Sequence, residues 1–145
     1  MATYPIFLCH VWSVDDGMER INSLFADYSR KTKGEFQYEY HSVSKDDPAQ
    51  FLRSNKALSQ LIEEQMAQCS CVVLLAGVYE EYKKWTNLEF DAARKLKVPL
   101  ILIEAADPKF TSFKEKRAAA AVVGWNDTEL CQAIEKLAKK NKIIK

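Results

Sequence analysis

Short apolar runs alternate with amphipathic stretches along the chain, and this pattern predicts β-strands that alternate with α-helices. The clearest strand is 71–76, in which every residue is apolar and which Gly77 ends. The clearest helix is 130–137, where apolar residues recur at positions i, i+3, i+4 and i+7. Weaker forms of the two patterns predict further strands at 6–9, 36–41, 98–103 and 120–123 and further helices at 18–28, 58–66 and 85–96.

This alternation predicts the fold class. Strands that are apolar on both faces are typical of a parallel sheet with helices on both faces. Five such strands in 145 residues fit a flavodoxin-like α/β fold, and the whole chain, 1–145, is predicted to be a single domain. The polar segment 42–54 is predicted to be a loop, and 105–118 a charged connection with room for a short helix.

Composition narrows the classes of function. The chain has 21 Lys and Arg against 20 Asp and Glu, so its net charge of +1 gives no basic field for nucleic acid. Its four glycines are too far apart for the G-x-G-x-x-G fingerprint or for a P-loop. Two histidines cannot build a histidine-rich metal site. We therefore expect neither a bound metal nor a nucleic-acid partner.

The cysteines and the apolar runs indicate the cellular compartment of the protein. The four cysteines lack the C-x-x-C spacing of zinc and redox sites, and Cys9 and Cys71 fall inside apolar runs, which predicts that they are buried. No signal peptide is visible, and no apolar run approaches the roughly 20 residues that span a bilayer. We therefore expect a cytoplasmic protein with reduced thiols and no membrane contact.

Polar and aromatic residues follow the predicted strands. His10 follows the first strand, Ser42 the second, Tyr79 the third and Trp125 the fifth. In open parallel sheets, ligands bind outside the carboxyl ends of the strands, where the strand order reverses. These residues are therefore predicted to lie on one rim, where a tryptophan ring can stack on a flat ligand.

The segment 85–90 supports two interpretations. Thr86 and Glu89 have the spacing of a capping box, and Trp85 and Phe90 stand at the positions of a hydrophobic staple, so a helix start explains all four residues. Alternatively, the Glu89 carboxylate faces the rim from the first turn of this helix. One carboxylate can stabilise an oxocarbenium-like ribose when the leaving group departs without an acid, as a pyridinium does.

Five short motifs carry a family resemblance. They are Phe-Leu-Cys-His-Val-Trp at 7–12, Ser-Val-Ser-Lys-Asp-Asp-Pro at 42–48, Ala-Gly-Val-Tyr at 76–79, Trp85-x-x-x-Glu89 and Val-Gly-Trp-Asn at 123–126. In this order they resemble a TIR domain, specifically the stand-alone TIR-like proteins of bacterial Thoeris anti-phage defence systems. The resemblance covers nearly the whole chain. Cys9 stands where that branch usually has serine, which weakens a hydrogen bond near the site.

The resemblance implies an activity. Catalytic TIR domains cleave the nicotinamide–ribose bond of NAD, and the glutamate at the position of Glu89 is their essential residue. We therefore expect an NAD glycohydrolase or ADP-ribosyl cyclase that makes an ADP-ribose-derived, cyclic signalling nucleotide, with Glu89 catalytic. NAD is then the substrate, and no cofactor is expected. The residues assigned to substrate binding are Phe7, Cys9, His10, Trp12, Ser42, Asp46, Tyr79 and Trp85.

The same resemblance implies partners. In active TIR assemblies a neighbouring subunit completes each site, so self-association is expected. A separate effector protein is expected to read the nucleotide, and a phage-derived trigger is a further expected partner. Whether the product is ADP-ribose, a cyclic isomer or a conjugate stays open.

Two other functions remain as alternatives. One is a non-catalytic TIR scaffold that acts by self-association, with 42–54 as its contact surface and Glu89 as part of the capping box. The other is a nucleoside deoxyribosyltransferase-like N-glycosidase, which is similar in fold and also uses a glutamate. That alternative predicts nucleobase exchange without NAD consumption.

Overall fold

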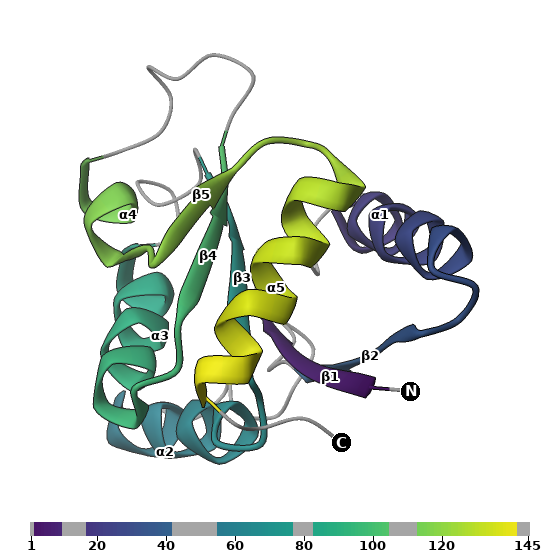
Figure 1. Cartoon of the computed structure of the whole chain (residues 1–145). Helices are drawn as coiled ribbons and strands as arrows, with labels where there is room; N and C mark the ends of the chain where they lie inside the picture. Colours follow the sequence, from purple (N-terminus) through teal and green to yellow (C-terminus); the bar gives the residue numbers. More distant parts are fainter. Residues whose placement is uncertain (1, 10–16, 42–54, 77–82, 105–112, 142–145) are drawn as a thin grey trace.

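The computed structural model describes residues 2–9, 17–41, 55–76, 83–104 and 113–141, which form one parallel sheet and its covering helices (Figure 1). The strands are β1 (Ala2–Leu8), β2 (Phe36–His41), β3 (Cys71–Leu75), β4 (Leu100–Ile103) and β5 (Ala121–Val123). The helices are α1 (Gly17–Lys31), α2 (Asn55–Met66), α3 (Lys83–Leu96), α4 (Phe113–Ala118) and α5 (Asp127–Asn141). The strand order is β2-β1-β3-β4-β5, and every neighbouring pair is parallel.

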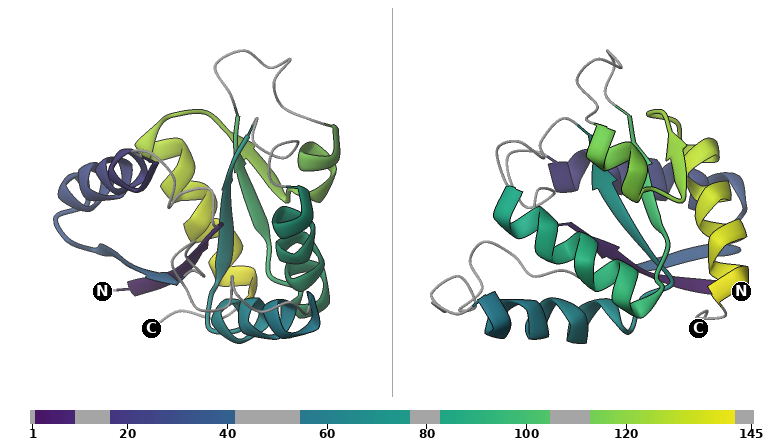
Figure 2. Two further views of the ribbon diagram at one scale, coloured as in Figure 1. Left: turned by 180° about the vertical axis from the view of Figure 1, so that it is seen from behind. Right: turned by 90° about the vertical axis from the view of Figure 1, so that its left-hand side faces the viewer.

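Helices cover both faces of this sheet, as predicted (Figure 2). α1 and α5 pack together on one face, and α2 and α3 pack together on the other, with α4 beside α3. This arrangement confirms the flavodoxin-like α/β fold. The strand order reverses between β1 and β3, so the adjacent carboxyl ends of these two strands form the point where ligands bind in such folds.

The inner strands are buried on both faces. Consecutive residues, such as Ile6 and Phe7 in β1 or Val72 and Val73 in β3, have no exposed surface. This is the burial that continuous apolar strands require in a covered parallel sheet. The predicted burial of the cysteines is confirmed as well, and all of the free thiols lie in the core: Cys9, Cys69, Cys71 and Cys131.

The edge strand β2 has one apolar face, as its alternating sequence predicts. Phe36, Tyr38 and Tyr40 pack against Phe25 of α1, with ring centroids 6.3, 5.1 and 5.9 Å from the Phe25 ring. Residues between them, such as Glu39, point to the other face of the strand. This aromatic row fixes α1 against the edge of the sheet.

Three strands begin at residues other than those predicted, and one of them, β5, begins a single residue late, at Ala121 rather than at residue 120. β1 begins at Ala2 rather than at residue 6, because residues 2–5 pair with residues 36–39 of the edge strand and carry little apolar signal. β4 begins at Leu100 rather than at residue 98, because residues 97 and 98 still close the end of α3. The short helix expected in 105–118 is α4, at the end of that connection.

Candidate active site at the carboxyl ends of β1 and β3

Helix α3 buries two polar side chains against the sheet. Thr86 and Glu89 have no exposed surface, and with Phe90 and Ala93 they form the inner stripe of the helix. A carboxylate is almost never fully buried unless it has a hydrogen-bonding partner. The environment of Glu89 is therefore set by the group that bonds to it.

One such partner is Cys9, the residue that directly follows β1. The Cys9 thiol forms a hydrogen bond with the Glu89 carboxylate. Burial, followed by the charge and the hydrogen bond of Glu89, raises the pKa of the Cys9 thiol well above its usual value, so the thiol keeps its proton and donates it. The Cys9 N–H donates to the Val73 carbonyl of β3 at 3.3 Å. These contacts place Glu89 beside the point where the strand order reverses.

The prediction that Thr86 and Glu89 form a capping box is wrong. The prediction that Trp85 and Phe90 form a hydrophobic staple is therefore wrong as well, because it assumed the same helix start. α3 begins at Lys83, so Thr86 lies inside the first turn, and Glu89 lies in the second turn rather than the first. Lysine is a good helix former, and Lys83 and its neighbour extend the helix beyond the apolar pattern. Within the described part of the chain, the Thr86 hydroxyl makes no hydrogen bond, unlike a capping residue.

The structure brings four of the predicted site residues onto two neighbouring elements. Phe7 and Cys9 point to the same face at the end of β1, since they are two residues apart along the strand. Trp85, half-buried against the core, lies about one helical turn before Glu89 on α3. The remaining predicted site residues lie outside the described residues: His10, Trp12, Ser42, Asp46 and Tyr79.

The residues after β5 have partners that build the start of α5. The Asn126 side-chain oxygen accepts the Glu129 N–H at 2.9 Å, and the Glu129 carboxylate accepts the Gly124 N–H at 3.1 Å. The Arg20 guanidinium lies 4.3 Å from the centre of the Trp125 ring, a cation–π contact. One face of Trp125, which was a candidate for stacking on a ligand, is therefore covered by Arg20.

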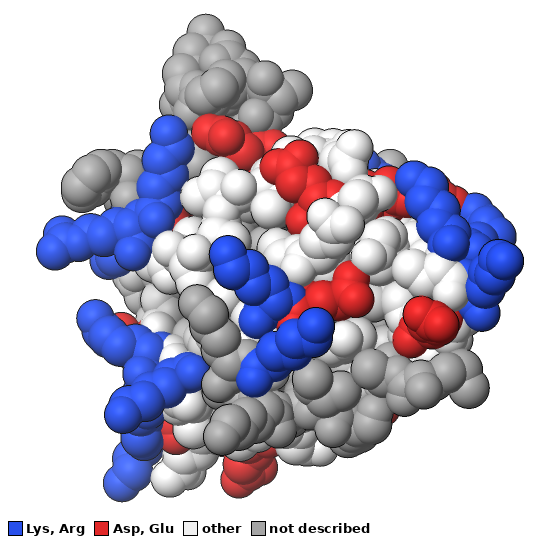
Figure 3. All heavy atoms as spheres, viewed as in Figure 1, with Lys and Arg blue, Asp and Glu red and all other residues white. Residues whose placement is uncertain are grey.

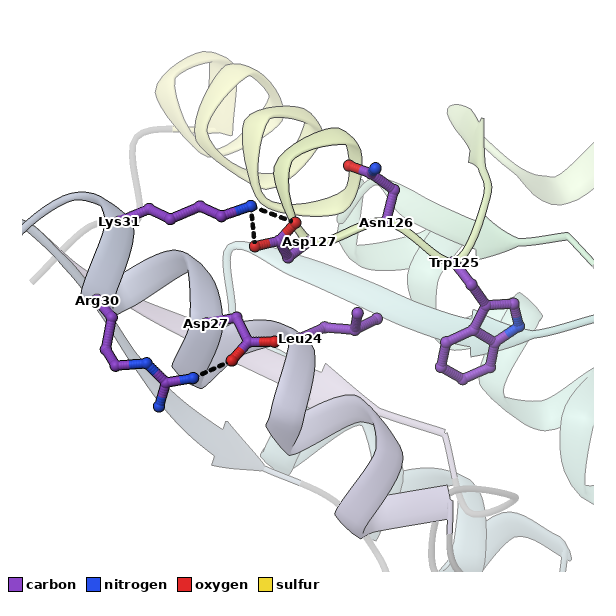
Figure 4. A pocket seen from close by; sticks show the side chains of 7 residues that line it. All are labelled: Leu24, Asp27, Arg30, Lys31, Trp125, Asn126 and Asp127. Atoms are coloured by element: carbon purple, nitrogen blue, oxygen red, sulfur yellow. Dashed lines mark hydrogen bonds and ion pairs between the residues drawn. The ribbon is translucent and has the colours of Figure 1, made fainter.

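The described surface carries a hollow and a groove, and neither is lined by Glu89 or Cys9. The hollow, of about 490 Å³, lies between α1 and α5, where Lys31 and Asp127 form an ion pair at 2.8 Å (Figure 4). The groove, of about 940 Å³, lies between α3 and α4, on the side where Figure 3 shows many Lys and Arg side chains (left). Its cationic lining residues are Arg94, Lys97, Lys114 and Arg117.

Three further features concern a histidine on the edge strand, possible metal ligands and membrane spans. His41 Nε2 lies 3.0 Å from Glu39 Oε1 on the edge strand. No three His, Cys, Asp or Glu side chains within the described ranges are grouped so that they could hold a metal ion. Among the helices that the structure describes, none is sufficiently long and apolar to cross a bilayer.

The strand order, the covered sheet and a buried glutamate beside the strand reversal define a flavodoxin-like α/β domain with a candidate active site. A protein-family model described as Thoeris protein ThsB, TIR-like domain, matches residues 7–109, a span that includes Cys9 and Glu89. The chain belongs to this family, as the sequence motifs predicted. Membership assigns it to anti-phage defence, in which it works with other components of the Thoeris system.

Similar solved structures share the fold at low sequence identity. A 3-dehydroquinate dehydratase-like protein from Bifidobacterium longum is 14% identical, with a TM-score of 0.52 over 96% of this chain and 97% of that chain. The type II dehydroquinase from Propionibacterium acnes is also 14% identical, with a TM-score of 0.51 over 94% of this chain and 98% of that chain. These likenesses concern the fold alone. No curated protein matches the chain.

The sequence pointed to both partners of the central contact but not to the contact itself. Cys9 was expected near the substrate, and Glu89 was expected to be catalytic, yet no pattern joined the two side chains. The sequence did not indicate Thr86 as a site residue, because its capping-box spacing predicted a local role for its hydroxyl at the helix start. Its burial on the inner stripe of α3 becomes visible only when the start of the helix is known.

Proposed function

We propose that this protein is an NAD-consuming enzyme of Thoeris defence that cleaves the nicotinamide–ribose bond. It transfers the ADP-ribose moiety to an acceptor and produces an ADP-ribose-derived, cyclic signalling nucleotide that activates a separate effector. The observation that carries the proposal is the fully buried Glu89 carboxylate beside the carboxyl ends of β1 and β3, in a TIR-like domain. Ligands of doubly wound folds bind at this position.

The chemistry needs little more than one anion and a shaped pocket. The C1′–N bond of the nicotinamide riboside breaks, and its electron pair leaves with neutral nicotinamide. Positive charge then spreads over C1′ and the ring oxygen of the ribose, where a carboxylate in a water-poor site stabilises it strongly. An acceptor oxygen or nitrogen forms the new bond to C1′ and releases its proton. Since the Glu89 carboxylate is covered, NAD binding must open a path to it.

The Cys9 thiol contributes to this scheme by holding the carboxylate. A donated hydrogen bond fixes the orientation of the Glu89 side chain at the end of β1. The thiol itself is a poor nucleophile here, because burial and the neighbouring carboxylate raise its pKa. We therefore give Cys9 a positioning role.

The test is to follow NAD and its products by liquid chromatography and mass spectrometry at protein concentrations that favour self-association, with and without an extract of phage-infected cells as a source of the trigger. The proposal expects release of nicotinamide together with a product that carries the ADP-ribose moiety. The mass of that product separates hydrolysis, cyclisation and conjugation. NAD that stays intact under these conditions contradicts the proposal.

A non-catalytic scaffold is the second candidate, and the burial of Glu89 is the observation that favours it. A carboxylate that joins α3 to the end of β1 also has a purely structural use. The scaffold predicts intact NAD and defence signalling that persists in the Glu89→Gln variant. The enzyme hypothesis predicts that NAD is consumed and that defence signalling is lost in the Glu89→Gln variant.

A further inference from the structure

Thr86 is a buried polar residue with an unused hydrogen-bonding group. Its side chain has no exposed surface, and its hydroxyl finds no hydrogen-bond partner within the described part of the chain. Burying such a group unpaired costs free energy, and most buried polar groups in proteins are paired. A hydroxyl left in this state beside a candidate active site suggests that its partner arrives with the substrate.

The position of Thr86 supports this reading. Helix α3 leads from β3 to the parallel strand β4, so it runs from the carboxyl edge of the sheet back toward the opposite edge (Figure 1). Thr86 precedes Glu89 by three residues on the same buried face, and it therefore lies about 4.5 Å nearer the carboxyl edge. A ligand that enters from that edge meets the Thr86 hydroxyl before it reaches the Glu89 carboxylate.

We propose that Thr86 is a substrate-binding residue whose hydroxyl donates a hydrogen bond to a ribose hydroxyl of the NAD substrate. This inference rests on the proposed function. A ribose presents neighbouring hydroxyl groups, each of which donates and accepts hydrogen bonds. The Glu89 carboxylate only accepts, so it takes the proton of one ribose hydroxyl. The Thr86 hydroxyl supplies the donor that a carboxylate lacks, and it bonds to the oxygen of the adjacent ribose hydroxyl.

The test compares Thr86→Val, which keeps the shape and removes the hydroxyl, with Thr86→Ser, which keeps the hydroxyl. Because the hydroxyl makes no hydrogen bond among the residues that the structure describes, the Thr86→Val protein should melt at the wild-type temperature or above it. Its KM for NAD should rise roughly tenfold, the effect of one lost hydrogen bond, while kcat changes less. Thr86→Ser should restore KM to near the wild-type value.

Thr32→Val is the matched control. The Thr32 hydroxyl is already bonded, since it donates to the Tyr28 carbonyl at 3.1 Å and accepts the Phe36 N–H at 3.1 Å. Removing it should lower the melting temperature and leave KM for NAD unchanged, the reverse of the pattern expected for Thr86→Val.

Three results overturn the inference, and they are distinguishable. If the wild type cleaves NAD and Thr86→Val has an unchanged KM, Thr86 does not bind the substrate, and the proposed function stands. A lower melting temperature of Thr86→Val, together with a KM for NAD that Thr86→Ser does not restore, shows that Thr86 has a structural role instead. If the wild type leaves NAD intact, the proposed function fails, and the role of Thr86 fails with it.

Discussion

At the scale of single residues, the hydrogen bond between Cys9 and Glu89 depends on a weak donor. A thiol donates less strongly than a hydroxyl, and this chain has cysteine where its relatives' motif usually has serine. The bond is nevertheless formed in the core, where a carboxylate without a donor is costly. The Cys9 thiol therefore supplies Glu89 with a donor, but a weaker one than a serine hydroxyl would be.

Replacing Cys9 tests this interpretation. Cys9→Ala removes the donor and should lower the free energy of unfolding by about 1–3 kcal/mol, because a buried carboxylate loses a partner. Cys9→Ser keeps a donor and should lower the free energy of unfolding by clearly less. Urea denaturation of the two variants measures the difference. An equal loss in both variants would show that the hydrogen bond contributes nothing and that only packing is affected.

A second side-chain hydrogen bond joins helices α1 and α5 on the opposite face of the sheet. The Tyr28 hydroxyl of α1 donates to the Glu135 carboxylate of α5 at 2.6 Å. This hydrogen bond, with burial and the charge of Glu135, raises the pKa of Tyr28 to about 12. The phenol is thus stabilised in its protonated form in the folded protein.

The raised pKa of Tyr28 fixes the pH range in which this bond acts. A group whose pKa is higher in the folded state adds stability below its unfolded pKa, about 10 for tyrosine, and this stability is lost as the pH rises toward 12. Tyr28→Phe should lower the free energy of unfolding by about 1–2 kcal/mol at pH 8. Urea denaturation from pH 8 to 11.5 should show this difference shrinking above pH 10. A difference that stays constant would contradict the assignment.

At the scale of elements, the end of α3 determines where β4 begins. Lys97 has a φ of 58°, in the left-handed region that favours glycine. The Val98 N–H donates to the Ala93 carbonyl at 2.9 Å, and the Lys97 N–H donates to the Arg94 carbonyl at 3.3 Å. This bonding pattern is a Schellman motif in which lysine occupies the position usually held by glycine.

Lys97→Gly is therefore expected to stabilise the protein. Removing the left-handed strain should raise the free energy of unfolding by about 0.5–1 kcal/mol. Lys136→Gly, in the exposed interior of α5, is the control and should lower it by about 1 kcal/mol. Thermal and urea unfolding measure both changes. Destabilisation by Lys97→Gly would mean that the lysine side chain makes a contact that outweighs the backbone strain.

The elements differ in how well the sequence predicts them. Apolar patterns locate all of the described strands and the helices α1, α2, α3 and α5, because burial against the sheet produces those patterns directly. The short helix α4 was expected only as part of a charged connection. The patterns fail at boundaries that other forces set. Residues 2–5 join β1 through pairing at the sheet edge, and the first residues of α3 are charged lysines with no apolar signal. The strained cap at Lys97 carries no glycine to mark it.

At the scale of the whole molecule, the fold brings the site together from distant parts of the chain. The sequence predicts Cys9 and Glu89 as site residues separately, since each belongs to a short motif. Their contact depends on the strand order and on which face α3 covers, and no local pattern encodes either. The unused hydroxyl of Thr86 is likewise a property of packing, so it becomes apparent only in the structure.

The strand order also shows how a chain without a glycine-rich loop would accept the dinucleotide that we propose as its substrate. In such folds ligands bind where the strand order reverses, which here is between β1 and β3, and this position needs no such loop. A buried carboxylate at this position suits a reaction in which positive charge develops on a ribose. NAD cleavage that depends on Glu89 is therefore the central claim.

The most direct test of this claim measures nicotinamide release from NAD by the wild type and by Glu89→Gln, which keeps the size of the side chain and removes its charge. Glu115→Gln is the matched control, because Glu115 is the other almost fully buried glutamate among the described residues and lies on α4. We expect release by the wild type and by Glu115→Gln, and a fall of at least about 100-fold in Glu89→Gln. Equal release by Glu89→Gln and the wild type would contradict the account.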